Sequence, residues 1–296
     1  MGSKRPGMPL SLLAASVLAI AGVVAGSAFA WGTHGKGERH GQNQLIPLYD
    51  NAKPVDWTEA CSQTNGSGGG SWIIANAAAG GEGGGPGSAP LPAWANVIEN
   101  CYRYGRASVI GYVWTDYGRG GQVALAAIES QIDAWYSYYP GEIAGIFFDG
   151  VSDVVPGMAT SNQGFYRALA SYVHAHEGNN DEVVFNFGAN PESDWMLNGG
   201  NAANADIVVT FEGSYDTPGE NPYTAWTQAG WELRYPANDF AALIHSAPGG
   251  PAAPQPASAC SSLAHQNIGY VYVGTSYEQL PSYFGALSAE ALSGNC

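Results

Sequence analysis

The feature that most constrains the fold of this chain is a series of eight short apolar segments separated by stretches of helical period. Each segment contains about four to eight residues, is rich in β-branched or aromatic side chains, and is bounded by Gly, Pro, Asn or Asp. The segments cover residues 44–49, 71–76, 108–114, 142–149, 182–188, 206–212, 240–246 and 268–275. Strands that alternate with helices form a parallel sheet, and eight strands can close it. The pattern therefore predicts an α/β fold, a single (β/α)8 TIM barrel.

The stretches between these segments support the same architecture. Residues 92–104 begin with Pro and end before Gly105, and apolar residues recur at helical spacing in 122–139 and 164–176. A closing helix is expected over 280–292, whereas Gly and Asn make helices weaker after the fifth and sixth segments. The alternative is an open doubly wound sheet. Such a sheet would have a Gly-rich first turn, but residues 49–54 read Tyr-Asp-Asn-Ala-Lys-Pro.

The first thirty residues have the parts of a secretory signal peptide. Lys4 and Arg5 precede an apolar stretch over residues 10–24, and Ala28-Phe29-Ala30 supplies the small-x-small pattern that a signal peptidase cleaves. We predict a signal peptide at 1–30, an N-terminal extension at 31–43 and a barrel catalytic domain at 44–296, in a secreted, extracellular protein. An uncleaved anchor is the alternative. No second apolar span follows, so we expect no membrane contact after cleavage. We also expect the mature protein to be a monomer.

The mature chain would be strongly acidic. The whole sequence has 10 Lys and Arg against 25 Asp and Glu, and removal of Lys4 and Arg5 leaves 8 against 25, a net charge of −17. This balance argues against nucleic acid and anionic lipid as partners and would suit a cationic substrate. Solubility outside the cell is the simpler explanation.

The cysteines and histidines indicate disulfides and no metal or cofactor. Cys61, Cys101, Cys260 and Cys296 all lie in the mature part, which suits an oxidising compartment. Three pairings are possible. In a barrel the first two helices are neighbours, and the last strand and last helix are also close, so we predict Cys61–Cys101 and Cys260–Cys296. No C-x-x-C spacing occurs, and the histidines show only a weak His-x-His.

Two predicted strands run from an apolar core directly into a carboxylate. Residues 145–149 read Gly-Ile-Phe-Phe-Asp, and residues 206–212 read Asp-Ile-Val-Val-Thr-Phe-Glu. Because the C-terminal ends of barrel strands surround the active site, Asp149 and Glu212 can converge across its mouth. Glycosidic bond cleavage needs such a pair: one group protonates the departing oxygen, and the other attacks the sugar carbon or activates water. The sequence thus predicts a glycoside hydrolase, and the alternative for either residue alone is a cap of the following helix.

Other side chains near the strand ends are predicted to bind a sugar. Tyrosine offers a flat surface for the C–H face of a sugar ring and a hydroxyl for hydrogen bonds, although it is also an ordinary barrel filler. The predicted substrate-binding residues are Tyr49, Asn76, Tyr112, Tyr117, Asn186 and Tyr272.

Five strings in order carry a resemblance to a known family. They are Ile-Pro-Leu-Tyr at 46–49, Gly-Tyr-Val-Trp-Thr-Asp-Tyr at 111–117, the two carboxylate strings at 145–149 and 206–212, and Gly-Tyr-Val-Tyr-Val at 269–273. Together they resemble the spherulin-4-like family, glycoside hydrolase family 135, over residues 45–284, and a related endo-α-1,4-galactosaminidase family has a similar Asp and Glu.

The resemblance implies a barrel that cleaves α-1,4-linked galactosamine polymers, including partly N-acetylated ones. By position, Asp149 would be the nucleophile and Glu212 the acid/base of a reaction that we expect to be retaining rather than inverting. A cationic galactosamine polysaccharide would be the partner, and it would suit the acidic surface.

The sequence departs from the family pattern at two places. The family usually has Asp-Glu after Phe-Phe, whereas this chain has Asp149-Gly150, with Asp153 as a candidate to replace the absent carboxylate. The second strand reads Asn76-Ala77 where the family has Asn-Pro. Two alternatives therefore stay open: a polysaccharide-binding barrel that is non-catalytic or of altered specificity, and an exported structural or coat protein.

Overall fold

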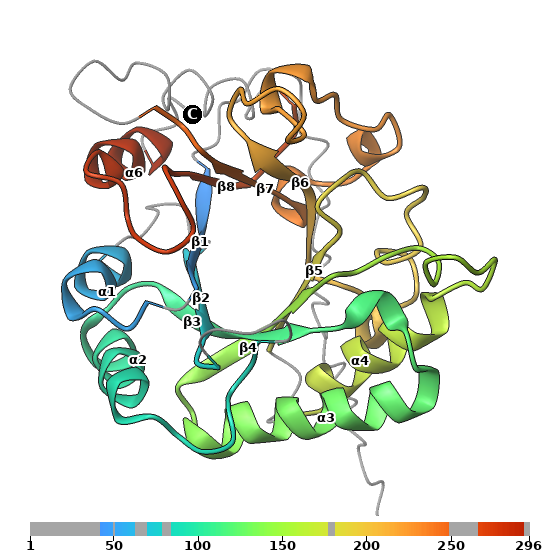
Figure 1. Cartoon of the computed structure of the whole chain (residues 1–296), viewed down its shortest axis with the longest axis horizontal. Helices are drawn as coiled ribbons and strands as arrows, with labels where there is room; N and C mark the ends of the chain where they lie inside the picture. The colour runs from blue at the N-terminus through green and yellow to red at the C-terminus, as the bar shows by residue number, and fades with distance from the viewer. Residues whose placement is uncertain are drawn as a thin grey trace, which may run out of the picture. The chain divides into compact units, whose positions relative to one another are not determined.

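Eight parallel strands form one closed barrel in the order of the sequence (Figure 1). The computed structural model describes residues 42–49, 51–62, 70–78, 84–176, 181–248 and 266–292. The strands are β1 Asn43–Tyr49, β2 Trp72–Asn76, β3 Ser108–Trp114, β4 Ile143–Asp149, β5 Glu182–Asn186, β6 Ile207–Ser214, β7 Phe240–His245 and β8 Tyr270–Val273. β8 closes the ring by pairing with β1 through Asn43↔Tyr270 and Gln44↔Val271. The predicted (β/α)8 barrel is confirmed.

Among the described residues, α-helices follow β1, β2, β3, β4 and β8 and pack on the outside of the barrel (Figure 1). They are α1 Pro54–Cys61, α2 Pro92–Tyr104, α3 Gly121–Tyr138, α4 Gln163–Ala175 and α6 Phe284–Leu292. The described residues between β5 and β7 form only short 3₁₀ turns, as the Gly and Asn content predicted. These turns are η2 Asn201–Ala203, η3 Tyr223–Ala225, η4 Glu232–Arg234 and η5 Ala237–Asp239.

The closing helix is shorter than expected. It begins at Phe284 and not at Leu280, because Pro281 biases the residue before it away from the helical region. The amide of Phe284 donates to the carbonyl of Pro281 at 2.9 Å, so the chain turns once before the helix starts.

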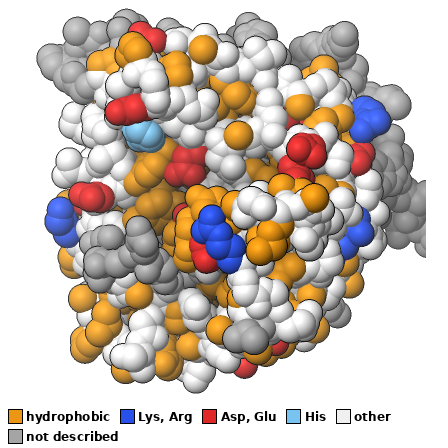
Figure 2. All heavy atoms as spheres, turned by 45° about the vertical axis from the view of Figure 1, so that its right-hand side comes forward, with side chains coloured by type: hydrophobic (Ala, Val, Ile, Leu, Met, Phe, Trp, Pro, Cys, Tyr) orange, Lys and Arg blue, Asp and Glu red, His pale blue; other side chains and the backbone are white. Residues whose placement is uncertain are grey.

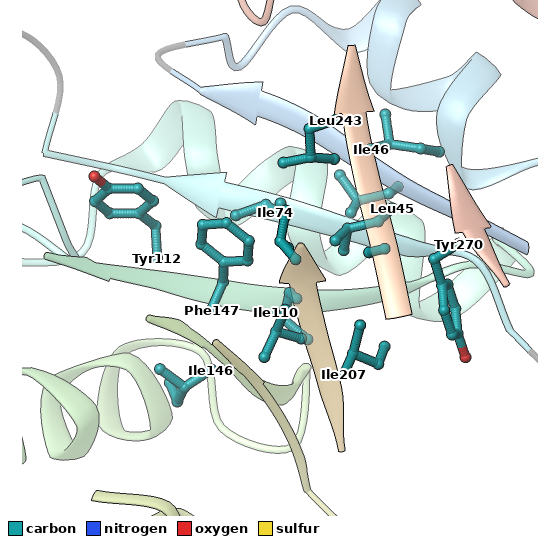
Figure 3. Close-up of a cluster of buried hydrophobic side chains, with 14 of the residues drawn as sticks. Leu45, Ile46, Ile74, Ile110, Tyr112, Ile146, Phe147, Ile207, Leu243 and Tyr270 are labelled. Carbon is teal, nitrogen blue, oxygen red and sulfur yellow. The ribbon is translucent and has the colours of Figure 1, made fainter. Parts of the chain in front are cut away.

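Apolar side chains fill the barrel and the layer between strands and helices. Leu45, Ile74, Phe147 and Leu243 are fully buried in a cluster contributed by four strands (Figure 3). Full burial of such a side chain contributes about 1.5–3 kcal/mol. This packing gives the strand ends a rigid base.

One predicted disulfide is confirmed. Cys61 at the end of α1 is bonded to Cys101 in α2, with the Cα atoms 5.3 Å apart. Cys260 and Cys296 lie outside the described residues, as do the predicted signal peptide and most of the predicted extension. Among the helices that the structure describes, none combines the length and apolar character that a membrane crossing requires.

Candidate active site

The C-terminal ends of β3 to β6 bring together four polar side chains. Tyr112 comes from β3, Asp149 is the last residue of β4, Asn186 is the last residue of β5, and Glu212 lies near the end of β6. Parallel strands end on one side of a barrel, so these residues share its C-terminal rim. The sequence prediction that Asp149 and Glu212 converge across the mouth agrees with this arrangement.

In both β4 and β6 a β-bulge precedes the carboxylate residue. β4 has one extra residue relative to β3 between the partners of Val109 and Gly111, and β6 has one extra residue relative to β7 between Val209 and Phe211. An extra residue reverses the side of the sheet that the following side chains face. The two bulges therefore decide which way Asp149 and Glu212 point.

Asp149 accepts three hydrogen bonds. The hydroxyl of Tyr112 donates to Oδ2 at 2.6 Å, and the amide of Gly150 and Nδ2 of Asn186 each donate to Oδ1 at 2.8 Å. Burial raises the pKa of the Asp149 carboxyl, and these three hydrogen bonds lower it in part. Hydrogen bonds to a carboxylate favour its charged form, so the three donors oppose the effect of burial.

Glu212 lies in a setting that favours its protonated form. Burial, followed by the charge of Asp149, raises the pKa of Glu212 to about 7, while hydrogen bonds with Asn186 and Tyr277 oppose the rise. A carboxyl with such a pKa can hold a proton near neutral pH and release it to a leaving group. Burial thus raises the pKa of both carboxyls, and Asp149 has more hydrogen-bond donors to oppose the rise than Glu212 has.

The gap between the two carboxylates is small. Nδ2 of Asn186 lies 2.8 Å from Oδ1 of Asp149 and 2.5 Å from Oε2 of Glu212. The two acceptor oxygens are therefore no more than about 5 Å apart.

Tyr49 and Tyr112 form an aromatic wall beside the carboxylates. Their ring centroids are 5.4 Å apart with an edge-to-face arrangement, and the Tyr112 ring stacks on Phe147 at 6.0 Å. The Tyr49 hydroxyl is buried and has no hydrogen-bond partner among the described residues. Its pKa is raised well above the usual value by burial and then by the charges of Glu212 and Asp149. The group is thus a neutral, buried hydroxyl without a partner among the described residues.

The other predicted substrate-binding residues have protein partners. Asn76 pairs in register with Tyr49, and its Oδ1 accepts a 2.7 Å hydrogen bond from the amide of Gly85 in the loop after β2. Tyr117 lies edge-on to Trp114 at 5.3 Å. Tyr272 is buried, and its hydroxyl donates to the carbonyl of Ser276 at 2.9 Å. The structure therefore brings Tyr49, Tyr112 and Asn186 together with the acids, while Tyr272 supports a loop.

The departure at Gly150 has a steric cause. Gly150 has φ +66°, and a Cβ atom there would lie 2.6 Å from the Trp114 ring. Trp114 thus occupies the space in which a neighbouring glutamate side chain would begin. Asp153 does not fill the role either, because Oδ1 accepts from the Trp195 indole at 2.6 Å and Oδ2 from the amide of Glu192 at 2.9 Å.

Tyr277 is a site residue that the sequence prediction missed. It lies in the loop after β8, where its ring is 5.9 Å from that of Tyr49, and its hydroxyl hydrogen-bonds with Glu212 and donates to the carbonyl of Leu243 at 3.1 Å. The rule that loops after barrel strands form the active face could have identified it.

Figure 2 shows acidic and hydrophobic side chains together in a hollow on one face of the molecule. Within the described ranges, no group of three or more His, Cys, Asp or Glu side chains is arranged to hold a metal ion.

The fold and the site define a glycoside-hydrolase-like (β/α)8 barrel with carboxylates at the ends of β4 and β6. Residues 43–291 match the sequence model of Spherulation-specific family 4, and the chain belongs to this family. The resemblance to the spherulin-4-like family, glycoside hydrolase family 135, is thereby confirmed.

A solved structure shares the fold at low sequence identity, and a second aligns less well. The crystal structure of Aspergillus clavatus Sph3 in complex with GalNAc aligns with a TM-score of 0.57 and 18% identity, over 86% of this chain and 99% of that chain. A family GH18 chitinase from Chromobacterium violaceum aligns with a TM-score of 0.49 and 13% identity, over 86% of this chain and 84% of that chain. No curated protein matches the sequence.

Proposed function

We propose that this protein is a secreted retaining glycoside hydrolase that cleaves α-1,4-linked polysaccharides containing galactosamine or N-acetylgalactosamine. The observation that carries the proposal is the pair Asp149 and Glu212, joined by hydrogen bonds to one amide group at the mouth of the barrel. Membership of Spherulation-specific family 4 supports a carbohydrate substrate, and the Sph3 structure contains GalNAc, a sugar of the proposed class.

In the first step, an oxygen of ionised Asp149 attacks the anomeric carbon of the sugar. The bond from that carbon to the glycosidic oxygen breaks, and Glu212 transfers its proton to the departing oxygen. The sugar is then bonded to Asp149 and Glu212 is ionised. In the second step, Glu212 takes a proton from water while the water oxygen displaces Asp149, which restores both groups.

The hydrogen-bond pattern matches these roles. Three donors stabilise the ionised form of Asp149, whereas a pKa of about 7 lets Glu212 act as an acid and then as a base. Tyr49 supplies a buried hydroxyl that could donate a hydrogen bond to a sugar oxygen or to an amide carbonyl, and Tyr112 and Tyr49 offer aromatic surface.

Charge and the confirmed disulfide support the remaining parts of the proposal. A mature chain of net charge −17 would attract a cationic galactosamine polymer, and the attraction would weaken as salt is added. The Cys61–Cys101 disulfide fits an oxidising environment outside the cell. We further propose that the mature protein acts as a monomer.

A second candidate is a carbohydrate-binding barrel without catalysis. The specific observation in its favour is Gly150, where the family pattern has a carboxylate beside the nucleophile and where Trp114 leaves no space for one.

A comparison of three proteins separates these candidates. Wild type, Asp149→Asn and Asp133→Asn are incubated with de-N-acetylated and N-acetylated α-1,4-galactosamine polymers, and released reducing ends and polymer binding are measured. Asp133 lies on α3 and accepts a hydrogen bond from the Tyr172 hydroxyl. Asp133→Asn therefore controls for the loss of one carboxylate outside the candidate site. We expect Asp149→Asn to bind polymer but to lose at least about a thousandfold in kcat. Equal product release from wild type and Asp149→Asn would refute the catalytic assignment, and binding without release by wild type would favour the binding barrel.

A further inference from the structure

Asn186 has an unusual set of hydrogen-bond partners. It is the last residue of β5 and is 2% exposed. A primary amide has two N–H donors, and in Asn186 the same nitrogen donates to Asp149 and to Glu212. Both donors therefore have protein acceptors, so a sugar would have to displace one of the acids to reach them.

The backbone around Gly188 fixes the orientation of this amide. Oδ1 of Asn186 accepts a 2.9 Å hydrogen bond from the amide of Gly188, which identifies Nδ2 as the end that faces the acids. The carbonyl of Gly188 in turn accepts from the amide of Glu212 at 3.0 Å. Gly188 has φ +64°, a conformation that glycine adopts without strain.

The backbone of Asn186 is hydrogen-bonded to the segment that follows Asp149. Its carbonyl accepts a 3.0 Å hydrogen bond from the amide of Val151, two residues after Asp149. Asn186 is thus connected to the end of β4 through its side chain, to the segment after β4 through its backbone, and to β6 through its side chain and Gly188.

We propose that Asn186 is a positioning residue that sets the gap between the two carboxylates and acts equally on both, and that it is not a direct ligand of the sugar. This inference rests on the proposed function for its kinetic consequences. The two N–H bonds hold one oxygen of each acid within about 5 Å of the other, so a change at this amide would change the gap in which the sugar carbon reacts.

The chemistry of the amide suits this position. A Lys or Arg side chain would stabilise both carboxylates as anions and would deprive Glu212 of its proton. A neutral amide donates to both acids, and its hydrogen bonds lower the pKa of each only in part. The pair can therefore hold one ionised and one protonated member at the same time.

The test measures carboxyl titration by ¹³C NMR and steady-state kinetics in wild type, Asn186→Ala, Asn186→Asp and Asn162→Ala. Asn162 is a matched control because its Nδ2 also donates twice, to the carbonyls of Tyr117 and Ser152, without contacting either acid. Asn186→Asp keeps the shape and the acceptor for Gly188 and replaces the donating nitrogen by oxygen, so it tests the same claim if Asn186→Ala does not fold.

We expect the carboxyl pKa values of Asp149 and Glu212 to rise together in Asn186→Ala and to rise further in Asn186→Asp, with no change in Asn162→Ala. Both limbs of the pH profile of kcat should move to higher pH. In Asn186→Ala kcat should fall about a hundredfold while KM stays within about threefold, because the geometry of the acids changes and sugar binding does not.

Two results would overturn the inference. One is unchanged titration of both acids in the Asn186 variants, and the other is a raised KM with unchanged kcat, which would make Asn186 a sugar ligand. The titration needs no substrate. If wild type cleaves no amino-sugar polymer, the proposed function fails, while the NMR result still decides whether Asn186 couples the two acids.

Discussion

Replacement of Gly150 by alanine should reveal why this chain lacks the second carboxylate of its family. At φ +66° a residue with a Cβ atom costs about 1–2 kcal/mol more than glycine. The new Cβ would also lie 2.6 Å from the Trp114 ring, and overpacking of this kind costs about 1–3 kcal/mol. We therefore expect Gly150→Ala to lower the free energy of unfolding by about 2–5 kcal/mol.

Urea unfolding of a small set of variants separates the two contributions. Gly141 also has a positive φ, +72°, but its Cβ position is open, so Gly141→Ala should cost only the conformational part, about 1–2 kcal/mol. In a double-mutant cycle, Trp114→Ala should reduce the cost of Gly150→Ala to the same value. The reasoning is wrong if Gly150→Ala and Gly141→Ala have equal effects in the wild-type background, or if the cycle shows no coupling between Trp114 and Gly150.

Two further predictions concern titrating groups. Tyr112→Phe removes the hydroxyl that donates to Asp149 at 2.6 Å, so the pKa of Asp149 should rise. The acidic limb of the pH profile of kcat/KM should then move to higher pH. An unchanged acidic limb would contradict the role of this hydroxyl. Burial raises the pKa of Glu232 to about 7, so the folded protein binds this proton more tightly than the unfolded chain does. The free energy of unfolding should thus fall by up to about 3 kcal/mol as the pH rises from about 4.5 to about 7. Glu232→Gln should remove this part of the pH-dependent loss of stability. The check is denaturant unfolding of wild type and Glu232→Gln at pH 5 and pH 8. The same pH dependence in the two proteins would refute the assignment to Glu232.

The sequence alone determined the strands, most helices and one disulfide. The strands and helices depend on local pattern: apolar runs with turn residues at their ends, helical spacing, and Pro at the start of α2. The position of Asp149 at the end of β4 and of Glu212 near the end of β6 also followed, because all strands of a parallel barrel end on the same side. The Cys61–Cys101 pairing followed from the adjacency of the first two helices.

The tertiary structure decided how the side chains at the rim use their hydrogen bonds. The extra residues in β4 and β6 set the direction of both acids, and a bulge leaves no clear mark in a run such as Val-Val-Thr-Phe-Glu. The bridge by Asn186, the approach of Tyr277 from the loop after β8, and the Trp114 ring over Gly150 each join segments far apart in the chain. Periodicity assigns a residue to an element and a face, but contacts between elements depend on register and packing, which exist only once the barrel has closed.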